Sequence, residues 1–305
     1  MSSSHLVLAL CGVLVLLPAC RFDTSGLVGS GGGSDAMEGP APDAAGADAA
    51  LIDASAMIDA AVVIDAPVAL PDAPPPDADN SAAGTALRFD GDNDFVRIDR
   101  TIGADFTIEA WIRTDKSRGG SNFFDGLGLF HCDFAGGGPR DDFGVSILND
   151  HLAFGVGSPD TTIESTTEVT TGEWVHIAVA RVQAQGTLRV FVNGVEERSV
   201  DADNRNVLDD RNVIDIGGNV IDDRYFEGDI DEVRVWDRAR SASEIASTMN
   251  QRLSGTESGL IGYWRLDDGS GQVAVDDAGD NDGRLGEGNS DAAPEFVTSG
   301  APISE

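Results

Sequence analysis

Short runs of apolar residues, separated by Gly, Asn and Asp, begin near Thr85 and continue to about residue 290. Within these runs Val, Ile, Phe and Trp alternate with polar residues, which is the pattern of half-buried β-strands. The segment FTIEAWIRT, residues 106–114, shows the pattern best, because every second side chain of a strand points to the same face. One face of this segment carries Phe106, Ile108, Ala110 and Ile112, and the other carries Glu109 and Trp111.

The same pattern predicts an all-β, antiparallel β-sandwich with one short helix. We expect strands near residues 86–89, 95–98, 106–113, 127–131, 143–148, 152–156, 161–165, 174–181, 188–192, 195–200, 212–216, 227–236 and 260–266. The pair Asn193-Gly194 supplies the positive φ angles of a tight hairpin turn. Only SASEIASTMN, residues 241–250, is predicted to be helical, with Ser241 or Ser243 as its N-cap. Many strands and one helix indicate a sandwich of about 200 residues with a continuous core.

The beginning of the chain has a different pattern, an apolar run over residues 6–17 (LVLALCGVLVLL). Its length is typical of a signal peptide and too short to span a bilayer. The next residues, Leu17-Pro18-Ala19-Cys20, resemble a bacterial lipoprotein signal, so residues 1–19 would be removed and Cys20 would carry lipid. We therefore expect a lipid-anchored protein of the outer membrane or cell surface, or a secreted protein if this signal is not used for lipidation.

Residues 20–83 consist mainly of Gly, Ala, Pro and Asp, with GSGGGS and repeated IDA and PDA triplets. Aromatic residues are nearly absent, prolines interrupt helices and the Asp charges repel one another, so we predict a disordered tether. The folded domain is predicted to span residues 84–290, and residues 291–305 are predicted to be a flexible tail.

The formal net charge of −33 argues against nucleic acid as a partner, because phosphate binding needs clustered Lys and Arg. The three cysteines do not form a disulfide framework, since Cys11 lies in the apolar leader and Cys20 sits at its end. We interpret Cys132, between His131 and Asp133, as a small residue in a core strand rather than a nucleophile. The histidines lack zinc-binding spacing, and no phosphate-binding, dinucleotide-binding or nucleophile motif is present.

Five segments occur in a recognisable order: ALRFDGDNDFVRI (86–98), FTIEAWIRT (106–114), GEWVHIAVAR (172–181), GTLRVFVNGV (186–195) and GDIDEVRVWDRARSASEI (228–245). Together with the later GLIGYWRLDDGSG and DDAGDNDGRL, they resemble the LamG-like jelly roll of the concanavalin A-like lectin and glucanase superfamily, which includes laminin G modules and pentraxins. This resemblance covers residues 84–290. It implies a jelly-roll fold and a module that recognises carbohydrate or protein ligands.

The segment EGDIDEVRVW, residues 227–236, raises a catalytic alternative. Glu227, Asp229 and Glu232 have an E-x-D-x-x-E spacing that could place carboxylates in a sugar-cleaving groove. Strict alternation puts Asp229 and Asp231 on one face and Glu232 on the other, so the trio would need a β-bulge. In the family that the chain resembles, this segment is ordinarily a structural strand that leads into a short helix. We therefore expect no catalytic residues and keep a glycan hydrolase as the alternative.

Two acidic loops are candidates for a calcium site, because calcium takes six to eight oxygen ligands that loops supply readily. The candidate ligands are Asp141 and Asp142 in GGGPRDDFG, and Asn219, Asp222, Asp223 and Glu227 in GGNVIDDRYFEG. Similarity to pentraxins implies that both loops lie where calcium is bound, at one edge of the sandwich. The other interpretation is that both are acidic turns facing water. The calcium hypothesis predicts a dissociation constant of about 10⁻⁴ to 10⁻³ M, typical of extracellular modules.

These observations predict a surface-tethered, non-catalytic recognition domain whose partner is a glycan or an extracellular protein, with calcium assisting. A module used only for protein–protein adhesion is a second alternative. Tryptophans could stack on sugar rings, but their positions within strands favour packing in the fold. The four tryptophans are Trp111, Trp174, Trp236 and Trp264.

Overall fold

The computed structural model describes residues 84–133, 140–209 and 211–304. The predicted signal peptide, the lipidation site Cys20 and the predicted linker over residues 20–83 lie outside the described residues. Within the described part of the chain, no helix is both long enough and apolar enough to cross a membrane.

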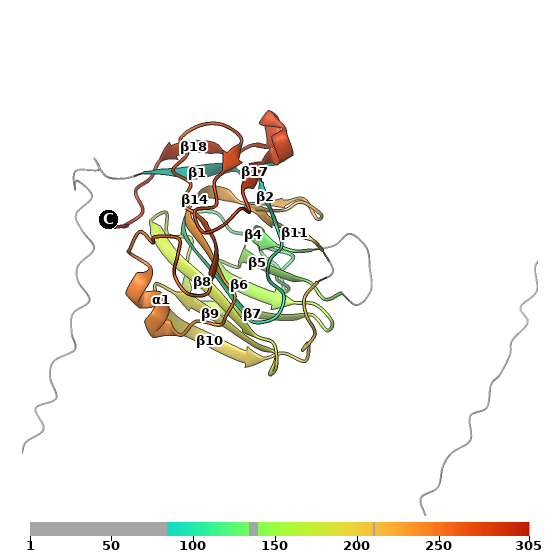
Figure 1. Ribbon diagram of the computed structural model, residues 1–305. Helices are drawn as coiled ribbons and strands as arrows, with labels where there is room; N and C mark the ends of the chain where they lie inside the picture. Colours follow the sequence, from blue (N-terminus) through green and yellow to red (C-terminus); the bar gives the residue numbers. More distant parts are fainter. Residues whose placement is uncertain (1–83, 134–139, 210, 305) are drawn as a thin grey trace, which may run out of the picture. The chain divides into compact units, whose positions relative to one another are not determined.

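Two eight-stranded sheets, in which all paired strands are antiparallel, pack face to face, which confirms the predicted all-β sandwich (Figure 1). Sheet A has the order β10-β9-β8-β3-β14-β1-β18, with β15 also paired to β14, and sheet B has the order β16-β17-β2-β11-β4-β5-β6-β7. The strands of sheet A are β1 (Thr85–Asp90), β3 (Phe106–Arg113), β8 (Trp174–Val182), β9 (Thr187–Val192), β10 (Val195–Asp201), β14 (Glu227–Trp236), β15 (Leu260–Trp264) and β18 (Glu295–Thr298). The strands of sheet B are β2 (Val96–Asp99), β4 (Leu127–His131), β5 (Phe143–Leu148), β6 (His151–Val156), β7 (Thr161–Glu168), β11 (Val213–Ile216), β16 (Val273–Ala274) and β17 (Gly283–Leu285). The remaining elements are the hairpin β12 (Gly218–Asn219) and β13 (Arg224–Tyr225), the helix α1 (Ala242–Thr248), and the 3-10 turns η1 (Gly286–Gly288) and η2 (Ser290–Ala292).

The hydrophobic core lies between the two sheets and follows the alternation in the sequence. In β3 the predicted inner residues all belong to this core, together with residues from β5, β6, β8, β9 and β14. The ring of Phe106 lies 5.1 Å from the ring of Phe143 and 6.1 Å from that of Phe154, both in sheet B. Burial of these side chains is the main source of stability that joins the sheets.

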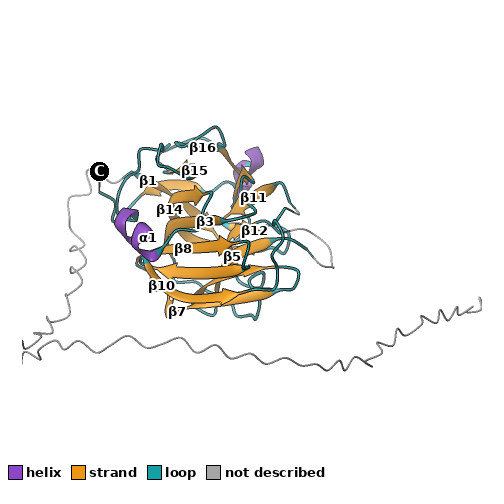
Figure 2. Cartoon of the chain, turned by 60° about the horizontal axis from the view of Figure 1, so that its bottom comes forward, coloured by secondary structure: helices purple, strands orange, loops and turns teal. Residues whose placement is uncertain are grey.

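Helix α1 packs on the outer face of sheet A (Figure 2). Ile245 is fully buried there against Ala178 and Ala180 of β8 and Phe191 of β9. Ser241 is the N-cap, and with Glu244 it forms a capping box, which satisfies backbone N–H groups that the first turn of a helix leaves without partners. The predicted helix and its first candidate cap are therefore confirmed.

Five short strands were not predicted from the sequence: β12, β13, β16, β17 and β18. Each has only two to four residues, which is too short to show alternation. The flexible tail expected over residues 291–305 is contradicted for the described residues up to 304. Strand β18 pairs with β1, and beyond it the backbone of Ser304 exchanges hydrogen bonds with Asn250 and Arg252. This segment is therefore ordered by contacts with residues that are far away in the sequence. A local sequence pattern does not reveal such contacts.

We predict that Phe296→Ala lowers the free energy of unfolding by about 1–3 kcal/mol, because the ring is partly buried and packs against the core. Denaturant unfolding of the full chain measures this change. Thr298→Ala is the control, since Thr298 lies in the same strand with an exposed side chain and should change stability by less than about 0.5 kcal/mol. If both substitutions are neutral, the segment is the flexible tail after all.

Candidate functional site

A β-bulge in β14 decides where the carboxylates of EGDIDEVRVW lie. Asp231 pairs with Trp111 and Arg234 pairs with Glu109, so Glu232 and Val233 together face a single residue of β3. Glu232 has a positive φ of 52° at this point. Val233 stays in the core, and Glu232 turns to the outer face of sheet A with Asp231. The bulge that the carboxylate trio requires is therefore present.

The same carboxylates are engaged in ion pairs. Asp229 is 3% exposed and accepts hydrogen bonds from Arg88 (Nε to Oδ1, 2.8 Å) and Arg113 (Nε to Oδ2, 2.9 Å). Glu232 is 2% exposed and accepts hydrogen bonds from Arg234 at 2.7 Å and from the hydroxyl of Tyr263 at 2.5 Å. Only Glu227 is exposed. Two of the three carboxylates thus have neutralising partners inside the protein, as expected of a structural motif rather than of a hydrolytic centre.

Asp231 is also buried and lies beside Glu232. It accepts hydrogen bonds from the backbone N–H of Glu232 at 2.8 Å and from the hydroxyl of Ser299. The pKa of Asp231 is raised to about 8, mainly by burial; the hydrogen bond from Ser299 opposes this rise and the neighbouring charge of Glu232 adds to it. The carboxyl therefore holds a proton at neutral pH, without a partner arginine.

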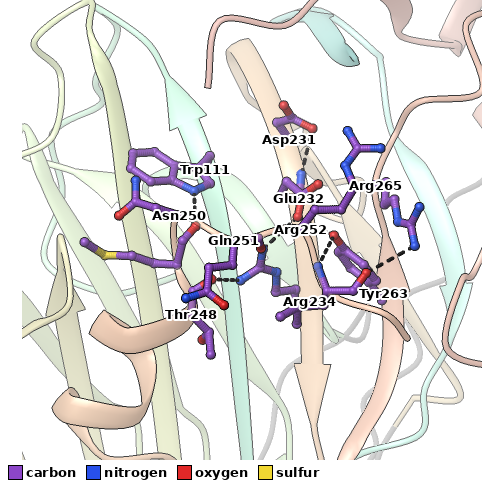
Figure 3. Close-up of polar contacts among 12 residues, drawn as sticks. Trp111, Asp231, Glu232, Arg234, Thr248, Asn250, Gln251, Arg252, Tyr263 and Arg265 are labelled. Atoms are coloured by element: carbon purple, nitrogen blue, oxygen red, sulfur yellow. Dashed lines mark hydrogen bonds and ion pairs between the residues drawn. The ribbon is translucent and has the colours of Figure 1, made fainter. Parts of the chain in front are cut away.

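Arginines from β14 and the turn after it fix the C-terminal end of α1. Arg234 donates to the carbonyls of Thr248 and Gln251 at 3.0 and 2.6 Å (Figure 3). Arg240 donates to the carbonyl of Glu244 and to the hydroxyl of Thr248. Thr248 is the last residue of α1, and the negative end of the helix dipole favours cations there.

Glu109 of β3 connects this network to the sheet. Its Oε1 accepts a hydrogen bond from the indole N–H of Trp236 at 2.9 Å and from Arg240 at 2.6 Å. Burial raises the pKa of Glu109, while the charges of Arg240 and Arg234 lower it. The polar residues of GDIDEVRVWDRARSASEI are therefore engaged in hydrogen bonds and ion pairs within the protein. These contacts explain the motif without a ligand.

The tryptophans behave largely as predicted. Trp111, Trp236 and Trp264 are buried, and their indole N–H groups donate to Met249 O, Glu109 and Asn281 O, respectively. Trp174 is only partly buried, and its ring lies 5.1 Å from the guanidinium carbon of Arg113.

Cys132 and His131 are buried at the end of β4. Cys132 lies in the core, as predicted, and burial raises the pKa of its thiol to about 12. The pKa of His131 is lowered to about 4, mainly by burial. Both side chains are uncharged at neutral pH, so neither has the properties of a reactive pair.

The second acidic loop brings two predicted ligands together with one that the sequence analysis did not select. The Nδ2 of Asn219 donates to Oδ2 of Asp133 at 2.9 Å and to Oδ2 of Asp222 at 3.2 Å. Burial and the charge of Asp133 raise the pKa of Asp222. Asp133 follows β4, about 90 residues earlier in the chain, and its contact with the hairpin β12–β13 depends on tertiary structure that the sequence pattern does not reveal.

The other predicted ligands lie against different partners. Asp141 accepts hydrogen bonds from the side-chain amides of Asn204 and Asn206, at 3.1 and 3.0 Å. Asp142 is buried, and its carbonyl accepts a hydrogen bond from Gly157. Among the residues that the structure describes, no three His, Cys, Asp or Glu side chains form a group able to hold a metal.

Asp223 and Glu227 complete the set of predicted ligands. Asp223 is exposed in the turn of the β12–β13 hairpin, with a positive φ of 53°. Glu227 lies at the start of β14, 3.6 Å from Lys116. The calcium hypothesis therefore rests on the cluster Asp133, Asn219 and Asp222, which we call the edge cluster.

Two hollows share a wall where β14 begins. The first has a volume of about 390 Å³ and extends toward Arg113, Thr114 and Asp115. The second has a volume of about 450 Å³ and extends toward η2 and β18. Both are lined by Arg88, Phe89 and Glu227, so the two hollows are adjacent, and together we call them the β14 groove. The sequence pattern does not reveal this groove. Its lining includes Arg88 of β1 and Arg113 of β3, which are distant from β14 in the chain.

Comparison with known proteins gives a family for this fold. The model of the concanavalin A-like lectin/glucanases superfamily matches residues 84–246. A structure of a proposed carbohydrate binding protein from Bacteroides ovatus has 24% sequence identity and a TM-score of 0.54, and the match covers 73% of this chain and 62% of that chain. No curated protein sequence gives a significant match.

Two further structures are similar over about half of this chain. A heptameric SAP-like pentraxin from Limulus polyphemus has 16% identity and a TM-score of 0.42, with 54% of this chain and 81% of that chain covered. Domains LG4-5 of the mouse laminin alpha1 chain have 16% identity and a TM-score of 0.40, with 53% and 45% covered. These similarities concern the fold alone.

We predict that Asp231→Asn alters the pH dependence of stability. The folded pKa of about 8 is above the ordinary value of 3.8, so the folded protein holds one more proton than the unfolded chain between these two values. Raising the pH through this window therefore lowers the stability of the unsubstituted protein, by up to about 1.4 kcal/mol per pH unit, and the loss ends above the folded pKa. Asn carries no such proton.

The free energy of unfolding of Asp231→Asn, relative to the unsubstituted protein, should therefore increase between about pH 5 and pH 8. Urea unfolding at several pH values measures it. Asp203→Asn is the control, because Asp203 is exposed and should show a difference that does not change with pH. A pH-independent difference for Asp231→Asn as well would show that Asp231 is ionised in the folded protein.

Proposed function

Since this chain belongs to the concanavalin A-like lectin/glucanases superfamily, we propose that its sandwich is a non-catalytic recognition module that binds glycans with the assistance of calcium. The observation that carries this proposal is the edge cluster, in which two carboxylates and an amide from distant segments meet. The likeness to the Bacteroides ovatus structure supports the choice of carbohydrate rather than protein as the ligand.

The edge cluster fits calcium in its chemistry. The carboxylates of Asp133 and Asp222 supply oxygens, the ligand type that calcium prefers. Asn219 directs its Nδ2 at both carboxylates and its Oδ1 accepts a hydrogen bond from the Ile221 N–H at 3.1 Å, so its amide would have to turn to supply a third oxygen. The raised pKa of Asp222 reports that burial and the charge of Asp133 disfavour its ionised form. A divalent cation would stabilise both ionised carboxylates. When bound, calcium would supply a charged centre that can coordinate sugar hydroxyl groups, while the three side chains hold it at the edge of the sandwich.

The ion pairs of β14 support the non-catalytic role that we propose. Asp229 and Glu232 are bound by arginines and nearly excluded from water. A general acid or nucleophile must instead reach the substrate directly. The hydrolase alternative would therefore depend on Glu227 alone among the three carboxylates of the motif.

We also propose that Cys20 is lipidated and that the linker of residues 20–83 holds the module away from an outer membrane or cell surface. The support is the Leu17-Pro18-Ala19-Cys20 sequence and the composition of the linker. Metabolic labelling with a fatty acid tests this proposal, since Cys20→Ser should remove the label and release the protein from membranes.

We predict that about 10 mM calcium raises the free energy of unfolding by about 1.4–2.7 kcal/mol, because a ligand that binds only the folded state stabilises it by mass action. Thermal or urea unfolding with calcium and with a chelator measures the shift. Asp222→Asn should abolish the shift, and the exposed Asp160→Asn is the matched control. A shift that persists in Asp222→Asn would place calcium elsewhere.

For the ligand itself, we predict that the full chain binds members of a glycan array in millimolar calcium and that a chelator weakens this binding. Binding that a chelator leaves unchanged would contradict the role of calcium. No binding in either condition would contradict the choice of glycan and favour a protein partner.

A further inference from the structure

We propose that the β14 groove is a second binding site, which takes an uncharged glycan and does not require calcium. The proposal rests on the glycan-binding function proposed above, but it concerns different residues from the edge cluster. The two hollows of the groove lie side by side and share the lining residues Arg88, Phe89 and Glu227. Each hollow is within the volume range of about 300–1,000 Å³ that is common for small-molecule sites.

A pair of arginines fixed by one buried carboxylate lines the groove. Arg88 and Arg113 each donate two hydrogen bonds to Asp229, and the side chain of Asp229 is only 4% exposed. A guanidinium group has five N–H donors, so each arginine retains donors for a ligand. The side chains of Arg88 and Arg113 are 52% and 34% exposed, so these donors are accessible to solvent.

The same contacts hold the two arginines in place. Asp229 holds both guanidinium groups by hydrogen bonds, and the guanidinium of Arg113 also lies over the ring of Trp174. A long, flexible side chain normally loses conformational entropy when it binds a ligand. Here much of that loss occurs during folding, so the groove presents preorganised donors.

Acceptors lie beside these donors. The carboxylate of Glu227 is 52% exposed and lines both hollows, and Asp115 lines the first. The main chain of Glu227 is held by the hydroxyl of Thr114, which donates to its carbonyl at 2.7 Å. A sugar hydroxyl donates one hydrogen bond and accepts others. Neighbouring hydroxyls of a sugar ring therefore suit a guanidinium and a carboxylate placed side by side.

The charges at the groove favour a neutral ligand. Around the first hollow, Arg88, Arg113 and Lys116 balance Asp115, Glu227 and Asp229. The second hollow is instead lined by acidic side chains, which would repel a uronic acid or a sulfated sugar. These side chains are Asp90, Asp94, Asp291 and Glu295.

The test is the glycan array in the presence of a chelator, with the full chain and a double variant, Arg88→Gln with Glu227→Gln. The unsubstituted chain should retain binding to uncharged oligosaccharides without calcium. The double variant should bind these about tenfold more weakly or less, since hydrogen bonds to charged groups are lost. The control is Arg198→Gln with Glu196→Gln, the same substitutions at exposed positions of β10, which should bind like the unsubstituted chain.

The outcomes separate this proposal from the calcium-dependent one. Glycan binding that disappears entirely in chelator, or that is unaffected in a folded double variant, overturns the β14 groove and leaves the edge cluster standing. A preference in chelator for uronic or sulfated glycans over their uncharged counterparts overturns the ligand class. If calcium-dependent binding is lost in Asp222→Asn while chelator-resistant binding is lost only in the double variant, both sites are supported. An array without any binding contradicts both.

Discussion

The burial of a carboxylate, that of Glu109, is the constraint on which the outer face of sheet A depends. Glu109 is fully buried between β3, β14 and α1, where an unpaired charge would cost several kcal/mol. The indole of Trp236 and the guanidinium of Arg240 both donate to its Oε1, whereas Oε2 has no hydrogen-bond partner among the described residues. Because Arg240 also donates to Glu244 and Thr248 of α1, the pairing of Glu109 and the docking of α1 depend on the same side chain.

The bulge at Glu232 is part of the same requirement. It turns Glu232 to the outer face, where its carboxylate pairs with Arg234, and Arg234 then binds the carbonyls that end α1. The ion pairs Glu232–Arg234 and Glu109–Arg240 therefore occupy the middle of the outer face of sheet A. The two binding sites that we propose lie outside this network: the edge cluster beside β4, and the groove where β14 begins.

The sequence predicts those strands and turns of helix that are determined by residues close together in the chain. Alternation in β3 identifies its inner residues, and the Ser241-to-Glu244 spacing identifies the helix cap, because both depend on residues close in the chain. The candidate sites are predicted less completely. Asn219 and Asp222 were selected, but Asp133 comes from another strand, and Asp141 turned out to bind Asn204 and Asn206. Spacing reports which residues could bind a metal, whereas their convergence depends on the packing of loops that are distant in sequence.

Arginine residues take part in both the buried network of sheet A and the β14 groove. The chain has 20 Lys and Arg residues against 53 Asp and Glu residues, and Lys116 is its only lysine. Arginines pair with the buried carboxylates of Asp215, Asp229, Glu109 and Glu232, and at Asp215 and Asp229 the planar fork of one arginine reaches both oxygens. Among the described residues Arg181, Arg234 and Arg240 are buried, and the large excess of Asp and Glu leaves the surface with net negative charge. A surface of this kind attracts divalent cations and repels anionic polymers. It is therefore consistent with a calcium ion at the edge cluster and with an uncharged glycan, rather than an acidic one, in the β14 groove.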